Sequence, residues 1–184
     1  MTVPAAIKAY VAHADPLARA CNVIALVVAA NQPFYPLYVL WLMGHGVIPT
    51  LLTFLSTPFF VAVPLLARRS SRWGRAMLVL AGMANTILAT KIFGQPSGVE
   101  LFLMPCIMIA AAFFRASEGA IAIALVTLGL GIFLGLDGRY GAPICQCSAA
   151  DEKALLSLHA LSAGTLVIFI GFLTRDSRPS PRSL

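Results

Sequence analysis

Six long apolar stretches, separated by short polar junctions, make up most of this chain. Each is close to the roughly 20 residues that a helix needs to cross about 30 Å of hydrocarbon, although the first is long and the fourth is short. Short junctions make successive helices pack as antiparallel hairpins. The pattern predicts an all-α polytopic membrane protein, one bundle of six transmembrane helices at Leu17–Gly44, Val47–Ala67, Ala76–Phe93, Val99–Phe114, Gly119–Leu136 and Ala154–Thr174.

Prolines interrupt three of these stretches, so we expect the first, second and fourth helices to be kinked. Each proline removes a backbone donor and leaves a carbonyl that needs another partner. Kinked helices around polar side chains favour a cavity, with kinks that only improve packing as the alternative. The prolines are Pro33, Pro36, Pro58, Pro64 and Pro105.

Positive charge alternates from junction to junction along the chain. Ten of the thirteen Lys and Arg residues fall on one side, and Lys91, Arg139 and Lys153 on the other. Because cytoplasmic loops retain positive charge, both termini should be cytoplasmic, and we expect a multi-pass protein of the cell inner membrane. Residues 1–16 then form a cytoplasmic segment, 17–174 the membrane domain, and 175–184 a polar, Pro-rich, disordered cytoplasmic tail.

Composition excludes several classes of protein. Hydrophobic residues make up 59% and charged residues 11%, against roughly 25% charged in soluble domains. The cations sit at helix ends beside lipid headgroups rather than among exposed aromatics, so we expect no nucleic-acid partner. The sequence contains no phosphate-binding loop, no Gly-x-Ser-x-Gly motif and no His-Glu-x-x-His motif, so we expect no enzyme and no cofactor.

Polar residues from several stretches share one depth near the predicted outer side, at a rise of about 1.5 Å per residue. Such groups should face the bundle interior, because a charged group facing lipid costs about 2.5–3.5 kcal/mol. We predict an outward-opening pocket for a small amphiphilic ligand, lined by Asn31, Gln32, Tyr35, Lys91, Glu100 and His159. Lys91 and Glu100 would hold the polar head, and Phe34, Tyr35 and Phe102 would cover the apolar body.

Each of these residues also has a structural interpretation. Lys91 and Glu100 could form a salt bridge that closes a helical hairpin, with Lys91 extended toward the interface. Asn31 and Gln32 could hydrogen-bond one helix to another. His159 is favoured as a packed or hydrogen-bonded residue over a metal ligand, and we expect no resident metal.

Two cysteines, Cys145 and Cys147, flank Gln146 in the predicted outer loop. In an oxidising compartment they favour a tight disulfide, with free thiols, or a soft-metal site completed by His45, as alternatives. Cys21 and Cys106 lie in apolar stretches and are interpreted as small apolar fillers.

Small residues at four-residue spacing indicate close helix packing. Gly131 with Gly135, and Ala160 with Gly164, form such pairs. Packing within the bundle is the favoured interpretation and a homodimer face is the alternative.

Three runs carry a resemblance to a known group: Asn31-Gln32-Pro33-Phe34-Tyr35-Pro36-Leu37-Tyr38, Glu100-Leu101-Phe102-Leu103-Met104-Pro105-Cys106 and Phe113-Phe114-Arg115. Together they resemble the six-helix membrane sensor regions that precede histidine kinase or nucleotide cyclase domains in bacteria. The resemblance implies reception of small amphiphilic or apolar signals. Ten residues follow Thr174, so we expect the signal to pass to a partner protein rather than to an attached catalytic domain.

The sequence thus favours a sensor-like or regulatory membrane module. One alternative is a substrate-binding transport subunit, since the chain is similar in size and helix number to the vitamin-capturing subunits of energy-coupling-factor transporters. Another is an accessory subunit that stabilises a larger membrane complex, in which case the polar layer serves packing only.

Overall fold

The structure, a computed structural model, describes residues 2–176, and all its regular elements in that range are helices. Residues 177–184 of the predicted tail, with Arg178 and Arg182, lie outside this range. The α-helices are α1 Val3–Val11, α2 Pro16–Asn31, α3 Tyr35–Met43, α4 Val47–Thr50, α5 Thr57–Arg69, α6 Ser71–Phe93, α7 Leu103–Ala112, α8 Gly119–Leu136 and α9 Ala149–Asp176. Short 3-10 turns are η1 Gln32–Phe34, η2 Leu51–Ser56, η3 Gln95–Ser97, η4 Val99–Phe102 and η5 Ala116–Glu118.

Five continuous helical segments are long and apolar enough to cross a membrane: Pro16–Met43, Val47–Arg69, Ser71–Phe93, Ala116–Leu136 and Ala149–Arg175. The expected all-helical architecture is therefore confirmed, and these segments are consistent with a multi-pass membrane protein. The segment Val99–Ala112 is a shorter apolar helix, so a count of six spans stays a prediction.

Segment boundaries differ from the predicted ones by a few residues. The last segment begins at Ala149 instead of Ala154 because Ser148 and Asp151 exchange hydrogen bonds across its first turn. The third begins at Ser71 instead of Ala76, since Arg72 and Arg75 belong to α6 rather than to a loop.

The prolines lie mostly where α-helix gives way to tighter turns. Pro33 lies in η1, which separates α2 from α3, and Pro58 follows η2 at the start of α5. Pro64 lies inside α5, and Pro105 lies in the first turn of α7. A proline near a helix start leaves few intrahelical bonds broken. The predicted bends of the helix axes stay a prediction.

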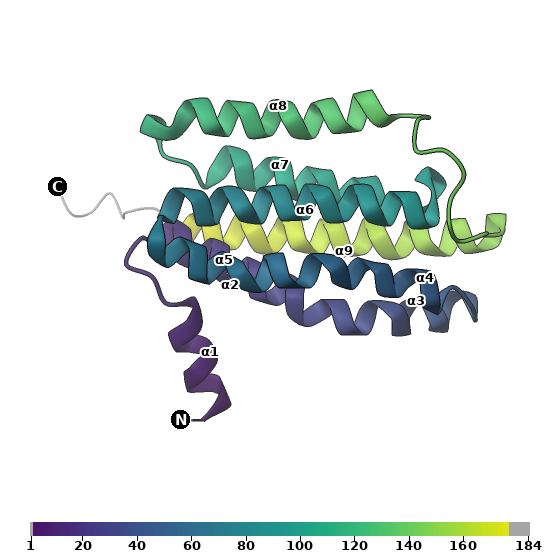
Figure 1. The fold of residues 1–184 in the computed structure, drawn as a ribbon, viewed down its shortest axis with the longest axis horizontal. Helices are drawn as coiled ribbons and strands as arrows, with labels where there is room; N and C mark the ends of the chain where they lie inside the picture. The colour runs from purple at the N-terminus through teal and green to yellow at the C-terminus, as the bar shows by residue number, and fades with distance from the viewer. Residues whose placement is uncertain (1, 177–184) are drawn as a thin grey trace.

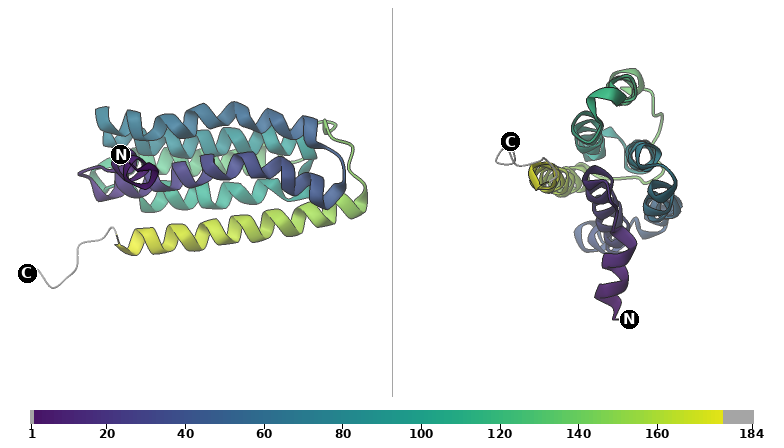
Figure 2. Two further views of the ribbon diagram at one scale, coloured as in Figure 1. Left: turned by 90° about the horizontal axis from the view of Figure 1, so that it is seen from below. Right: turned by 90° about the vertical axis from the view of Figure 1, so that its left-hand side faces the viewer.

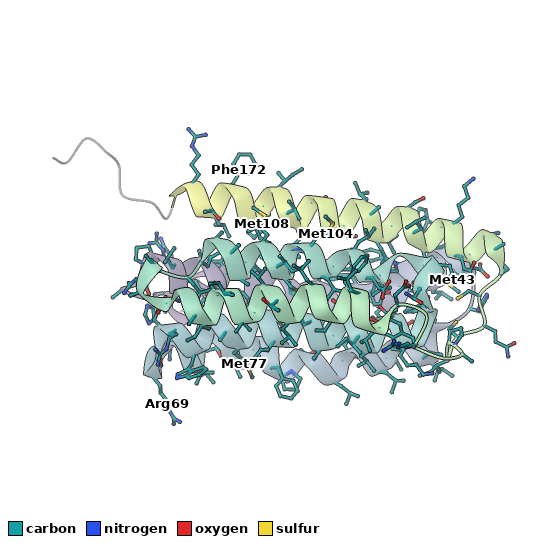
Figure 3. The ribbon with its side chains drawn as sticks, turned by 90° about the horizontal axis from the view of Figure 1, so that it is seen from above. Met43, Arg69, Met77, Met104, Met108 and Phe172 are labelled. Atoms are coloured by element: carbon teal, nitrogen blue, oxygen red, sulfur yellow. The ribbon has the colours of Figure 1, made fainter. Side chains whose placement is uncertain are left out.

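The helices that follow α1 run side by side along the long axis of the bundle (Figure 1). Helix α6 is central and packs against α2, α5 and α7, whereas α8 lies at the periphery against α7 (Figure 2). We call the two ends of the bundle the Arg75 end and the Lys91 end, after residues near the two ends of α6. Arg69 lies at the former and Met43 at the latter (Figure 3).

Two apolar cores follow each other along this axis. The larger includes Ile24, Phe60, Val79 and Ile109, and the smaller, near the Lys91 end, includes Phe93 and Leu155. Large apolar side chains also cover the outside, as Phe172 shows where it projects from α9 (Figure 3). An apolar exterior of this extent is typical of a lipid-facing bundle.

Helix α1 runs across the bundle axis at the Arg75 end and extends away from the other helices (Figures 1 and 2). The Tyr10 hydroxyl anchors its end by donating to the Val61 carbonyl at 2.7 Å, and the Arg68 guanidinium lies over the Tyr10 ring. The predicted N-terminal segment 1–16 therefore contains a helix of its own, a feature that its short apolar pattern did not indicate.

Candidate functional site

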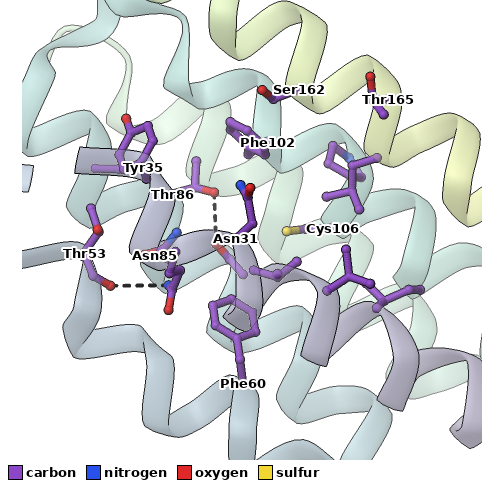
Figure 4. Close-up of a pocket in the computed structure, with 18 of the residues that line it drawn as sticks. Asn31, Tyr35, Thr53, Phe60, Asn85, Thr86, Phe102, Cys106, Ser162 and Thr165 are labelled. Carbon is purple, nitrogen blue, oxygen red and sulfur yellow. Dashed lines mark hydrogen bonds between the residues drawn. The ribbon is translucent and has the colours of Figure 1, made fainter. Parts of the chain in front are cut away.

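A pocket of about 870 Å³ lies between the first helical segment and α9, with α6 and α7 behind it (Figure 4). We call it the lateral pocket. Val27 of α2, Phe34 of η1 and Leu161 of α9 line it and are 46%, 52% and 71% exposed. Because these residues come from the middle of long helices, the pocket opens at the side of the bundle rather than at an end.

The polar groups of the lateral pocket lie on facing walls. Asn31 lies at its centre, with Asn85 and Thr86 on α6 and Ser162 and Thr165 on α9 (Figure 4). The Thr86 hydroxyl is occupied, since it donates to the Gly82 carbonyl at 2.9 Å. The Asn31 amide is exposed within the pocket and makes no hydrogen bond to any residue that the structure describes. It is therefore free to bind something that enters.

Gln32, the next residue, is buried and fully engaged. Its Nε2 donates to Ser56 Oγ at 2.5 Å, and its Oε1 accepts from the Thr57 hydroxyl. Ser56 Oγ also lies 2.8 Å from Asn85 Oδ1, which extends the network from η1 through η2 to α6. Gln32 thus lines the lateral pocket, and its amide serves as a hydrogen-bonded link between helices.

Half-buried Tyr35 and buried His159 form a pair at the Lys91 end of the lateral pocket. His159 Nδ1 lies 2.7 Å from the Ser97 carbonyl, which can only accept, so Nδ1 carries the proton. His159 Nε2 then accepts from the Tyr35 hydroxyl at 2.9 Å. The Phe102 ring stands edge-on to the imidazole at a centroid distance of 6.1 Å. This chain joins α3, η3 and α9, and Tyr35 and Phe102 face the pocket while His159 lies behind them.

Lys91 and Glu100 depart from the predicted site. Lys91 Nζ donates to the carbonyls of Tyr140 and Ala142 at 2.9 and 2.7 Å. Glu100 Oε2 accepts from Gln95 Nε2 at 3.2 Å. Within residues 2–176 no ion pair joins Lys91 to Glu100, and neither residue lines the lateral pocket. Of the six predicted site residues, Asn31, Gln32 and Tyr35 line the lateral pocket, whereas His159, Lys91 and Glu100 do not. The predicted pairing of Lys91 with Glu100 does not form.

The reason is the connection formed by residues 137–148, which folds back over the end of α6. The Ile144 and Cys145 amides donate to the carbonyls of Lys91 and Ile92 at 3.2 and 2.8 Å. The Lys91 ammonium is thus bound to carbonyls of this connection instead of to Glu100. The Tyr140 side chain lies beside Glu100 instead, and burial, followed by the neighbouring carboxylate, raises the pKa of Tyr140 to about 12.

The cysteine pair lies in the same connection. Cys145 is buried and Cys147 half-buried, and both are free thiols in the structure. Burial and the adjacent Cys145 thiol raise the pKa of Cys147 to about 12, which keeps it protonated at neutral pH. His45 lies 3.4 Å from Asp151, and no group of three metal-binding side chains occurs among the described residues. The Cys145–Cys147 disulfide stays a prediction, which mass spectrometry after alkylation without reductant tests.

Sequence reasoning missed a charged cluster at the Arg75 end. Arg75 is 1% exposed and binds Glu118 through two bonds, at 2.9 and 2.8 Å. Its Nη1 also donates to the Phe113 carbonyl at 2.5 Å. Asp15 lies 3.2 Å from the Arg115 guanidinium and accepts from the Ser71 hydroxyl. We call Asp15, Ser71, Arg75, Arg115 and Glu118 the Arg75 cluster.

The Arg75 cluster joins the starts of α2 and α6 to the α7–α8 connection. Burial raises the pKa of Asp15, but hydrogen bonds from Ser71 and Leu17 and the charges of Arg115 and Arg75 outweigh it, so the pKa lies below its ordinary value. The signal available in the sequence was that Asp15 and Glu118 both fall on the arginine-rich side. Charge patterning alone identifies Arg75 and Arg115 only as determinants of orientation.

Comparisons of the chain with protein families, curated proteins and solved structures find no match in any of the three.

Proposed function

We propose that this protein is an integral membrane module of the sensor-like or regulatory kind, which binds a small amphiphilic ligand in the lateral pocket and acts through a partner protein. The observation that carries the proposal is the Asn31 amide, exposed inside an otherwise mostly apolar pocket and without a hydrogen bond to any described residue. A polar group left without a partner in an apolar environment is costly. A ligand with an apolar body and a polar group satisfies both features at once.

The location of the lateral pocket supports a signalling role. Its walls come from α2 and α9, which pack directly on each other only to a small extent. Occupancy would therefore change the spacing of these two helices, and α2 extends from the pocket to the Arg75 cluster. Small helix shifts of this kind are a common way of transmitting ligand binding.

A partner could receive the shift at α8, which packs mainly on α7 and leaves Ile123, Phe133 and Leu134 exposed. We propose that this face contacts a partner protein or a second copy of the chain within a bacterial inner membrane. Six membrane spans, with kinks at the prolines, belong to the same proposal.

Ligand binding is tested by identifying the small molecules that copurify with the protein from its native membrane. The chain, purified in lipid nanodiscs, should yield an organic-soluble molecule enriched over bulk lipid, as measured by mass spectrometry. Leu161→Trp should remove it by filling the pocket mouth. Leu134→Trp, at a 74% exposed position on α8 outside the pocket, is the matched control and should retain it. Identical extracts from both variants would contradict the proposal.

A further inference from the structure

The described lining of the lateral pocket is mostly apolar, with a few uncharged polar side chains. No Asp, Glu, Lys, Arg or His occurs among the described residues that line it. We infer that its ligand is an uncharged, lipid-soluble molecule with a hydroxyl, carbonyl or amide head, which enters from the bilayer between α2 and α9. This inference rests on the proposed function and specifies the class of ligand.

Two basic side chains at the Lys91 end of the bundle are already engaged. Lys91 is bound to two loop carbonyls, and both ring nitrogens of His159 have partners in Tyr35 and Ser97. A carboxylate, phosphate or ammonium head would therefore lose its hydration without gaining an opposite charge. The cost of leaving a charge unpaired in such a site is far larger than that of an uncharged polar group.

An uncharged head, in contrast, finds suitable partners. The Asn31 amide offers a donor and an acceptor, and Ser162 and Thr165 lie on the α9 wall of the same pocket (Figure 4). Neither hydroxyl is hydrogen-bonded to another described residue. A hydroxyl or carbonyl group placed between the walls can thus exchange hydrogen bonds with α2 and α9 together.

The apolar body of the ligand would lie in the apolar part of the lateral pocket. Ile24, Leu78, Ile109 and Phe169 line the part of the pocket toward the Arg75 end. Ile24 precedes Asn31 by two helical turns, which corresponds to about 10 Å along α2. The pocket is therefore long enough to take an extended hydrocarbon segment parallel to the helices, the direction of lipid chains in a bilayer.

Entry from the bilayer follows from the exposed rim. Val27, Phe34 and Leu161 present apolar side chains around the opening, in the middle of segments that are long and apolar enough to cross a membrane. A molecule dissolved in the membrane meets this opening directly, whereas a water-soluble molecule would first have to enter the lipid.

Three photoreactive probes with one alkyl diazirine chain and different heads, a hydroxyl, a carboxamide or a sulfonate, test the inference. Each is photolysed with the full chain in phosphatidylcholine nanodiscs, and labelled positions are mapped by mass spectrometry. Labelling of pocket residues is divided by labelling of the exposed face of α8, which corrects for partition into lipid. We expect the two uncharged probes to exceed the sulfonate by at least about tenfold, the ratio that 1.4 kcal/mol produces.

Variants separate the possible outcomes. Asn31→Leu should reduce pocket labelling by the hydroxyl probe about tenfold, whereas Thr127→Val, which removes an exposed hydroxyl on α8, should not change it. Because Asn31 has no described partner, its replacement should leave the gel-filtration profile unchanged. Pocket labelling by the sulfonate equal to or above that by the hydroxyl probe overturns the uncharged-ligand inference but retains the site. Labelling that Leu161→Trp does not reduce, with any probe, overturns the proposed function itself.

Discussion

At the scale of single residues, the Tyr35 hydroxyl has a defined direction because of what lies behind it. Ser97 fixes the proton on His159 Nδ1, so His159 Nε2 must accept and Tyr35 must donate. The oxygen of Tyr35 keeps its acceptor capacity toward the lateral pocket. The Ser97 carbonyl in η3 thereby determines, through His159, that the Tyr35 hydroxyl acts as a donor.

Tyr35→Phe should destabilise the protein by about 1–3 kcal/mol, because it leaves His159 Nε2 buried without a donor. The measurement is thermal unfolding in detergent. Tyr38→Phe provides the control, since Tyr38 also lines the lateral pocket but its hydroxyl is not bonded to a described residue. Equal effects of the two substitutions would show that the bond between Tyr35 and His159 contributes nothing.

Asp15 makes stability depend on acid pH. Its pKa lies below the ordinary value of 3.8 in the folded protein, so its contribution is fully present above that value and is lost as the pH falls through the lower, folded pKa. We expect the wild type to unfold at a higher temperature than Asp15→Asn between pH 5 and pH 7, with the difference shrinking below about pH 4. A difference that grows toward acid pH would reverse the assigned role of Asp15.

At the scale of elements, the connection between α8 and α9 depends on one cation from another helix. Lys91 binds two carbonyls of this connection, and the adjacent backbone of α6 accepts its amides. Residues 137–148 are thereby folded onto the end of α6.

Lys91→Met should release this connection. Amide hydrogen exchange at Ile144 and Cys145 should accelerate at least about tenfold, since hydrogen bonds to a charged group contribute about 1.5–3 kcal/mol. Lys153→Met, an exposed cation near the same end whose ammonium is not bonded to a described residue, should leave exchange there unchanged. Unaltered exchange in Lys91→Met would mean that backbone bonds alone hold the connection.

The helical segments could be predicted from the sequence because apolar length is a local property. Segment ends were placed within a few residues for the same reason. Depth also grouped Asn31 with Gln32, and both line the lateral pocket. Depth does not give direction around a helix, however. Depth placed Lys91 level with Glu100. The partner of Lys91 is instead the Tyr140 carbonyl, which lies in a connection nearly fifty residues later in the chain.

The Arg75 cluster escaped prediction for a related reason. Charge patterning treats every arginine near a helix end alike, although Arg75 is almost fully buried and Arg72 is exposed. The distinction arises only when Glu118 and Asp15, from distant segments, are brought to the same end. Pairing of this kind is a property of the assembled bundle.

At the scale of the whole molecule, orientation in the membrane is a prediction that labelling can test. In a background with Cys145 and Cys147 replaced by serine, an impermeant maleimide should modify Arg139→Cys in intact cells. Arg72→Cys should react only after permeabilisation, because arginine-rich ends remain in the cytoplasm. Both positions are exposed in the structure, so reactivity reports the side of the membrane. The reverse pattern would invert the orientation.

The lateral pocket is built from the first and the last of the membrane-crossing segments in sequence order. During synthesis, α2 emerges early and must wait, with Asn31 facing lipid or the insertion machinery, until α9 follows. The site is therefore incomplete in a partly inserted chain, and a nascent protein stopped before Ala149 would lack the wall that α9 supplies. The ligand binding that we propose therefore requires a completed chain, because the α9 side of the pocket forms only after α9 has packed against the earlier helices.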